Sequence, residues 1–491
     1  MANDPQNVNM TDQEDEVLFQ NIPWKYVRRL SAFPAAAFLL VMLIELISCF
    51  IFGDPYLALL SNGLVFDELS LIVAILGLLT IIFYFGKKSG EGIRPLSLLK
   101  ANLPAVFFLI LILLMFASTA YNGMTNMALY GDSYRKENLL SFVIYFAAYF
   151  FCSSLIADRK IKKRICYLFL AVGFAIAVCS LAYVVSGALH LDWLHELTSC
   201  MTYSGTIVGI YAQINHYAYQ LVFCVILSAS LFISEEKIPL KIFCMISFIV
   251  FNIVLIANDS FGPYLACFVA LIFNVIVLYI IDKRLNKTAL LMIGLFVVIS
   301  LVMSFWYDTI WHNVTTFFSD LTKVAASVQT DAQQAAADVG EDMYNGWRWR
   351  IWKYTVGYIK ESPIFGHGIE GIGERLTQVF GNDRPHNEFL QYAAFFGIPA
   401  ALMYIAGVFS VFLNGLKNKL YLDRYTLAAL VAAFGYLVSS CFGNTMYYTA
   451  PLFFIFLGMG NMPYVEADET QSEKQPPDQE ISDPTEKASE L

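Results

Sequence analysis

Two residues beside the longest polar connection of the chain have side chains suited to group transfer. His386 stands in the run Arg384-Pro385-His386-Asn387, directly before an apolar stretch. A histidine titrates near neutral pH and can take a proton from a hydroxyl group. His386 is therefore a candidate general base, and the alternative is a histidine that caps a helix or lies at the membrane surface.

The second residue is Arg348, in a segment that predicts an amphipathic helix over residues 342–361. At about 100° per residue, Arg348 and Trp352 share one face with Thr355 and Ile359, whereas Arg350 points elsewhere. An arginine on an apolar face needs an anion or a carbonyl group when that face is packed. Arg348 is thus a candidate anion ligand, and the alternative is an interfacial arginine that reaches lipid headgroups.

Other patterns in the outer loops carry less chemistry. The run Gly366-His367-Gly368-Ile369-Glu370-Gly371 matches a nucleotide-binding glycine pattern, but no strand precedes it, so we expect a flexible turn instead. No Asp-x-Asp, His-x-x-x-His or cysteine pair occurs in these loops, so we predict neither metal nor cofactor. Asp67 and Glu68 are alternative general bases for a differently organised site.

The composition requires a membrane as the solvent for these residues. Hydrophobic residues make up 58% of the 491 residues and charged residues only 14%. We predict an all-α polytopic membrane protein with about twelve transmembrane helices. The apolar stretches are 31–52, 67–86, 102–121, 139–157, 165–187, 212–233, 241–258, 262–281, 288–306, 386–413, 425–444 and 447–462.

Basic residues predict the orientation, because they concentrate in alternate connections, such as Arg159, Lys163 and Lys287, and such connections face the cytoplasm. Both termini are then cytoplasmic. The expected organisation is a cytoplasmic segment (1–30), helices one to nine (31–306), an extracytoplasmic loop with the amphipathic helix (307–385), helices ten to twelve (386–462) and a disordered acidic tail (463–491).

Three short motifs together resemble a family of bacterial envelope glycosyltransferases. They are Arg348-Trp349-Arg350-Ile351-Trp352, then Pro363-Ile364-Phe365-Gly366, then His386-Asn387 with Gly397. In this order they are similar to the O-antigen ligase and polymerase superfamily. The resemblance implies metal-independent transfer, with inversion, of a glycan from an undecaprenyl-diphosphate carrier to an acceptor hydroxyl at the outer face of the bacterial cell membrane.

The resemblance also implies roles for individual residues. It makes His386 and Arg348 catalytic. The expected substrate-binding residues are Arg350, Arg384, Trp352, Asn387, Asn215 and His216. The family often has an arginine near the sixth helix and Ser-Arg at the start of the eighth. This chain has Asn215-His216 and Asn258-Asp259-Ser260 there instead.

The partners expected from this reading are the lipid-linked glycan, an acceptor glycan or lipid, and membrane lipids, with no nucleic acid. Two other classes stay open. A secondary transporter is compatible with twelve helices, but the helix centres carry few charges and the halves show no repeat. A non-catalytic protein of envelope glycan assembly would not need Arg348 and His386 to meet.

Overall fold

The computed structural model describes most of the membrane-embedded part of the chain. The described residues are 33–60, 102–131, 137–155, 159–307, 347–445 and 447–461, with residues 71–73, 75, 76, 79, 82, 86 and 315. Much of the second apolar stretch, the two terminal segments and much of the loop at 307–385 therefore lie outside them.

Apolar helices dominate the described residues, and seven are long and apolar enough to cross a membrane. These seven are α3 (Phe33–Phe52), α6 (Leu103–Asn122), α9 (Arg159–Ala188), α11 (Ile214–Ser234), α12 (Ile238–Asn258), α13 (Phe261–Asp282) and α20 (Ile398–Lys417). This confirms the prediction of an all-α membrane protein, while the number of transmembrane helices, twelve, stays a prediction.

Shorter elements complete the bundle and its connections. The helices are α7 (Asn126–Tyr130), α8 (Leu139–Leu155), α10 (Asp192–Thr198), α14 (Lys287–Met303), α17 (Trp347–Glu361), α18 (Gly368–Phe380), α19 (Glu388–Phe396), α21 (Arg424–Ser440) and α22 (Ala450–Met459), with 3-10 turns η1 (Ser199–Met201) and η3 (Leu420–Leu422). Strands β1 (Thr202–Tyr203) and β2 (Thr206–Ile207) form an antiparallel hairpin.

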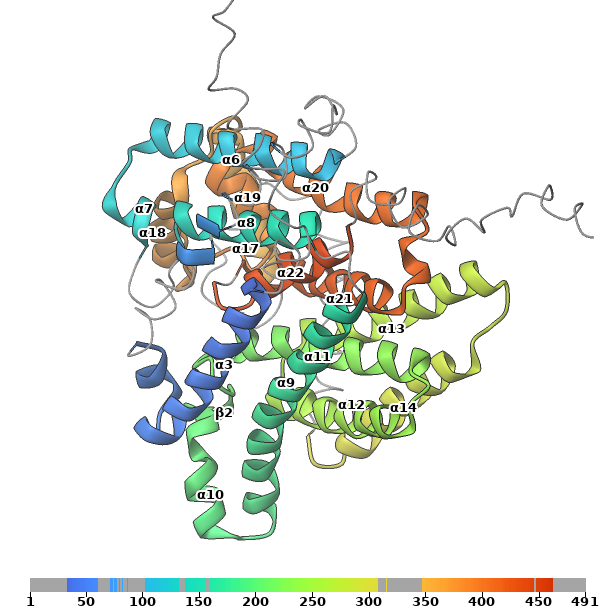
Figure 1. The fold of residues 1–491 in the computed structure, drawn as a ribbon. Coiled ribbons are helices and arrows are strands. Elements are labelled where there is room, and N and C mark those ends of the chain that lie inside the picture. The colour runs from blue at the N-terminus through green and yellow to red at the C-terminus, as the bar shows by residue number, and fades with distance from the viewer. Residues whose placement is uncertain are drawn as a thin grey trace, which may run out of the picture.

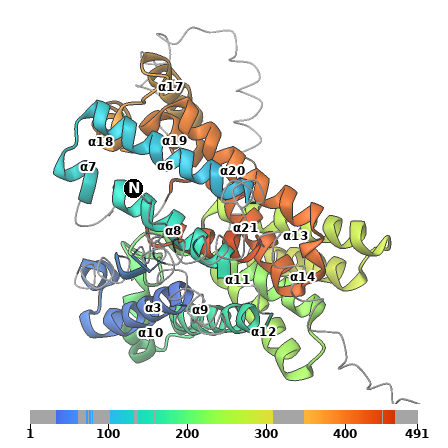
Figure 2. The same ribbon diagram turned by 45° about the horizontal axis from the view of Figure 1, so that its top comes forward.

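Helix α11 forms the centre of the bundle, because every residue from Tyr217 to Leu231 is buried. It packs against α9, α12, α13 and α21. Helix α20 lies alongside α6, and α22 lies against α8. Helices α7, α17 and α18 gather at one end of the α6–α20 pair (Figures 1 and 2). This end holds the residues that the sequence predicts for the site.

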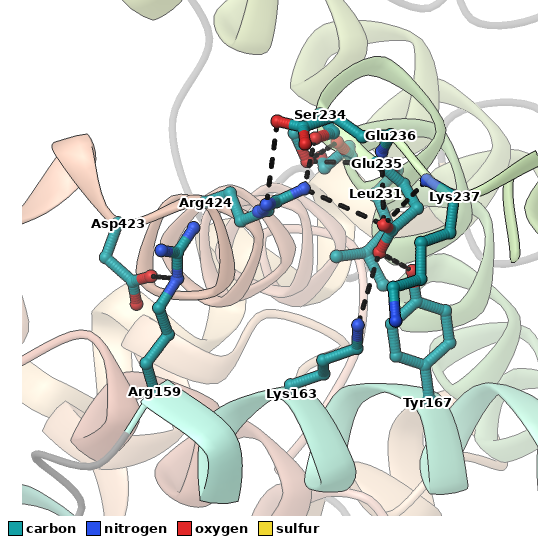
Figure 3. A network of polar contacts seen from close by, with 11 residues as sticks. Arg159, Lys163, Tyr167, Leu231, Ser234, Glu235, Glu236, Lys237, Asp423 and Arg424 are labelled. Atoms are coloured by element: carbon teal, nitrogen blue, oxygen red, sulfur yellow. Dashed lines mark hydrogen bonds and ion pairs between the residues drawn. The ribbon is translucent and has the colours of Figure 1, made fainter.

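The opposite end of the bundle is tied together by charged residues (Figure 3). Glu235, just after α11, accepts a hydrogen bond from Tyr167 of α9 at 2.7 Å. Lys163 of α9 and Arg424 of α21 lie 3.7 and 3.8 Å from its carboxylate oxygens. Arg159 pairs with Asp423 at 3.2 Å. The basic residues that served to predict the orientation thus help to join three helices.

The prediction of a single helix for the tenth apolar stretch is wrong, because the stretch contains two helices, α19 and α20. Gly397 separates them with a φ of 90°. A Cβ at Gly397 would lie 2.0 Å from the Ile364 carbonyl oxygen. The two helices pack against each other through Tyr392 and Tyr404, whose rings stack at 4.2 Å. The backbone at residue 397 lies so close to the Ile364 carbonyl that only glycine fits, and its positive φ angle ends α19 before α20 begins.

The glycine-containing segment between α17 and α18 differs from the expected flexible turn. Gly366 and Gly368 have positive φ angles, as a turn requires, but α18 begins at Gly368. The His367 amide donates to the Ala394 carbonyl at 2.8 Å, and its Nε2 lies 2.7 Å from the Tyr358 carbonyl. The turn is thus packed against α17 and α19. Helix α17 ends at Glu361, where the sequence predicts it to end.

Candidate functional site

The predicted site residues converge on the polypeptide between α21 and α22, residues 441–449, which we call the α21–α22 connection. Gly443 lies at its centre, and a Cβ there would be 2.0 Å from the Tyr219 hydroxyl. The same hydroxyl donates to the Ser439 carbonyl at 3.1 Å, at the end of α21. The central helix α11 is thus in direct contact with the connection, which leaves no room for a side chain at residue 443.

His386 and Asn387 are anchored to this connection by separate hydrogen bonds. The His386 amide donates to the Asn444 side-chain oxygen at 2.8 Å, and the Asn387 side-chain amide donates to the Cys441 carbonyl at 3.0 Å. Asn387 also caps α19 by accepting from the Leu390 amide. His386 has a φ of 50°, a conformation uncommon for residues other than glycine. The half-buried imidazole is therefore held on a fixed backbone.

Arg348 and Trp352 approach from α17. The Trp352 ring lies 6.4 Å from the ring of Phe442, and Arg348 lies one turn earlier on the same face of α17. Both side chains are half-buried. The Trp352 Nε1 is buried and donates no hydrogen bond to a described residue. This face of α17 therefore brings a cation and an N–H donor to the connection.

The rest of α17 explains why this face is packed. Ile351 and Thr355 are fully buried and Ile359 is nearly so. Arg350 is rotated by about 200° from Arg348 around the helix axis. Arg350 therefore points away from Arg348, as the sequence predicts.

Asn215 and His216 open α11 on the other side of the connection. The His216 ring lies 6.0 Å from the ring of Tyr448, and Asn215 accepts a hydrogen bond from the Ser260 hydroxyl at 3.4 Å. Glu45 of α3 is 2% exposed and lines a small pocket with Tyr211 and Tyr448. The sequence reasoning missed Glu45, although an acidic residue inside an apolar helix is a signal for a functional site.

Arg384, another predicted site residue, forms a buried ion pair with Glu137. Its Nε and Nη2 both lie 2.6 Å from Glu137 Oε2, and its Nη1 donates to the Asp383 carbonyl. Gln391 donates to the other oxygen of Glu137 and accepts from the Thr445 amide. Arg384, Glu137 and Gln391 are all buried. They tie the segment before α19 to the α7–α8 connection and to the α21–α22 connection.

Glu388 is a further residue that sequence reasoning did not select. It is fully buried, two positions after His386, and accepts a hydrogen bond from Tyr404 at 2.7 Å. Its place in the first turn of α19 suits a negative charge, since the helix dipole is positive there. Glu137, Gln391 and Glu388 act on residues distant in sequence, so no local pattern could have identified them.

The arrangement combines a histidine, an arginine and an indole N–H around one largely buried connection. An arginine and an N–H donor can stabilise a phosphate leaving group, and a histidine can accept the proton of an attacking hydroxyl. Within the described residues no three His, Cys, Asp or Glu side chains cluster as metal ligands, so no residue set for a metal can be named.

Comparison with known protein families supports this reading. Residues 242–405 match the family model described as O-antigen ligase. The matched segment begins in α12, ends in α20 and includes both Arg348 and His386. No curated protein gives a significant match to the chain.

Proposed function

Because the chain is a member of the O-antigen ligase and polymerase superfamily, we propose that it transfers or polymerises glycan carried on undecaprenyl diphosphate. The acceptor is a hydroxyl group at the outer face of the bacterial cell membrane. Both termini are then cytoplasmic, and the charged end shown in Figure 3 faces the cytoplasm.

One observation carries the proposal: residues from three distant segments meet at the α21–α22 connection. Trp352, one turn after Arg348 on α17, lies beside Phe442, the His386 amide donates to Asn444, and His216 lies beside Tyr448. A protein that only supports envelope assembly has no need of a cation and two imidazoles at one place. A transfer reaction needs a base and an anion ligand around a single bond.

The proposed reaction is a single displacement at the anomeric carbon of the donor sugar. The acceptor hydroxyl forms the new glycosidic bond while its proton passes to His386. The bond between the anomeric carbon and the phosphate oxygen breaks, and the diphosphate leaves with the electron pair. Attack opposite to the leaving group inverts the anomeric configuration. Arg348 and the Trp352 N–H stabilise the charge that develops on the diphosphate.

The other predicted ligands have distinct places in this proposal. Asn387 and His216 border the site through the α21–α22 connection, and Asn215 adjoins His216. Arg350 remains a predicted ligand on a different face of α17. We assign Arg384 to positioning His386, because Glu137 already neutralises its charge in a buried ion pair.

The test is glycan transfer by the purified full-length protein in lipid nanodiscs with an undecaprenyl-diphosphate-linked glycan. Arg348→Lys keeps the charge but removes the planar fork, so we expect a loss of about a hundredfold or more in kcat. His386→Ala should lose about 10²–10⁴-fold. Chelator should leave the wild-type rate unchanged, because the Arg348 guanidinium supplies the positive charge that stabilises the leaving diphosphate.

Two control variants match these changes at the outer surface. Arg375→Lys alters an exposed arginine paired with exposed Glu361, and His190→Asn alters an exposed histidine with a φ of 53°. Both should transfer at the wild-type rate. Normal transfer by Arg348→Lys and His386→Ala would overturn the assignment, and loss of activity in chelator that magnesium restores would overturn the metal-free mechanism.

A further inference from the structure

A pocket of about 800 Å³ opens between α9, α12, α14 and the β1–β2 hairpin. Among the described residues, four aromatic side chains lie in its wall, namely Tyr183, His195, Trp306 and Tyr307. The rings of Tyr183 and His195 stack on each other at 4.3 Å. The volume lies within the range of small-molecule sites, which combine apolar walls with a few polar groups.

The polar groups of this pocket come from the end of α12. Asn258 is 1% exposed, and its Nδ2 donates to the carbonyls of Ile207 and Ile214 at 2.7 and 3.1 Å. Its Oδ1 is also buried but accepts no hydrogen bond from a described residue. Asp259 follows in the left-handed conformation with φ of 66° and is exposed at the pocket. The wall therefore offers the Asp259 carboxylate beside aromatic side chains.

This combination fits a saccharide better than a lipid chain. A sugar ring has C–H faces that pack on aromatic rings, and hydroxyl groups that can donate to the exposed Asp259 carboxylate. An isoprenoid or acyl chain would fill the apolar part but would cover this carboxylate without offering it a donor, which is unfavourable.

The pocket is also joined to the proposed catalytic site. Ser260, next to Asp259, donates to Asn215, and Asn215 precedes His216 in the first turn of α11. Arg348, the proposed ligand of the donor diphosphate, lies on α17, whereas the pocket borders α12. We propose that the pocket binds a sugar residue of the acceptor glycan, an inference that rests on the proposed transfer function.

The kinetic test compares two pairs of variants in the nanodisc transfer assay. Trp306→Ala and Asp259→Asn alter pocket residues, whereas Trp193→Ala and Asp192→Asn alter exposed residues of α10 outside it. Trp306 and Trp193 are 72% and 69% exposed, so the two changes are matched. The pocket variants should each raise KM for the acceptor about tenfold, with kcat and donor KM within about twofold. Unchanged acceptor KM in both would overturn the proposal.

A binding measurement separates this inference from the transfer function. Saturation-transfer NMR on the nanodisc protein would use methyl β-D-glucoside, methyl N-acetyl-β-D-glucosaminide and farnesol as probes. We expect saturation of the sugar ring protons that both pocket variants lose and both α10 variants retain. Farnesol saturation lost in the pocket variants, without any for the glycosides, would show a lipid site and overturn the proposal. If wild-type protein binds glycosides this way but transfers no glycan, the transfer function fails and the sugar site stands.

Discussion

At the scale of single residues, the ion pair between Glu137 and Arg384 is the contact that most directly fixes the segment of His386. Both side chains are 8% exposed, and Gln391 links the pair to the Thr445 amide. A buried cation that loses its carboxylate keeps the cost of desolvation without the compensating attraction. The pair therefore affects both the stability of the protein and the position of the base.

We predict that Glu137→Gln lowers the free energy of unfolding by about 3 kcal/mol, because the buried Arg384 keeps its charge and is left with the longer contact to the Asp383 carboxylate, at 3.5 Å. The measurement is unfolding of the detergent-solubilised protein by sodium dodecyl sulfate. Glu361→Gln is the control, since it breaks an Arg–Glu pair of similar length, to Arg375, whose side chains are 49% and 55% exposed. That change should cost about 1 kcal/mol or less. Equal losses in both variants would show that burial of the Glu137 pair is unimportant.

At the scale of helices, Glu235 links α9, α11 and α21 at the charged end of the bundle (Figure 3). Burial raises the pKa of its carboxyl, but the Tyr167 hydrogen bond, the Lys237 amide and Lys163 together bring it below the usual value of 4.5. A carboxyl with a lowered pKa in the folded state stabilises that state above its ordinary pKa. This stabilisation is lost as the pH falls through the folded pKa.

Glu235→Gln should therefore be less stable than wild type by roughly 1.5–3 kcal/mol at pH 7, the value of hydrogen bonds to a charged group. The difference should shrink as the pH falls below 4.5, where the wild-type carboxyl also becomes neutral. Unfolding curves between pH 3 and 8 provide the measurement. Glu236→Gln, whose side chain is 87% exposed, should match wild type throughout. A difference between Glu235→Gln and wild type that is constant with pH would contradict the electrostatic account.

Helix boundaries show what local sequence can predict. The end of α17 at Glu361 follows from Ser362-Pro363, because the residue before proline disfavours the helical conformation. The break at Gly397 was missed, although Gly397-Ile398-Pro399 carries the signal of a turn followed by a helix start. Hydropathy averaged over the stretch concealed it, since both α19 and α20 are apolar. The contact with the Ile364 carbonyl that requires this glycine is visible only in the fold.

At the scale of the whole molecule, the bundle has a charged end and an end where the candidate site lies. We predict that the site end faces outward, because basic loops remain in the cytoplasm. Glu374→Cys in α18 should react with an impermeant thiol reagent in intact cells, whereas Lys160→Cys in α9 should react only after permeabilisation. Both positions are exposed.

Wild-type protein is the background for this labelling, since its nine cysteines are buried or half-buried. The opposite pattern, with Lys160→Cys labelled in intact cells, would place the site in the cytoplasm. A donor presented at the outer face would then be unable to reach it.

The candidate site could be predicted from the sequence in its parts but not in its assembly. Arg348, Trp352 and His386 were identified from residue type and spacing and His216 from the family resemblance, and the structure places Trp352, His386 and His216 against the α21–α22 connection. The connection itself was not predicted, because it lies between two apolar stretches and contains no catalytic side chain of its own. Its role comes from contacts such as Asn444 to His386, which are 58 positions apart. Such pairings leave no periodic pattern in one sequence.

The position of this connection near the carboxyl end has a consequence for biosynthesis. A ribosome making this chain adds Arg348 and His386 before it translates Asn444 and Tyr448. Until then His386 lacks the acceptor for its amide, and His216 lacks its aromatic neighbour. A nascent or prematurely terminated chain ending before residue 441 thus contains both proposed catalytic residues without the segment that assembles them. Unfinished copies in the membrane would be inactive and would not consume lipid-linked glycan.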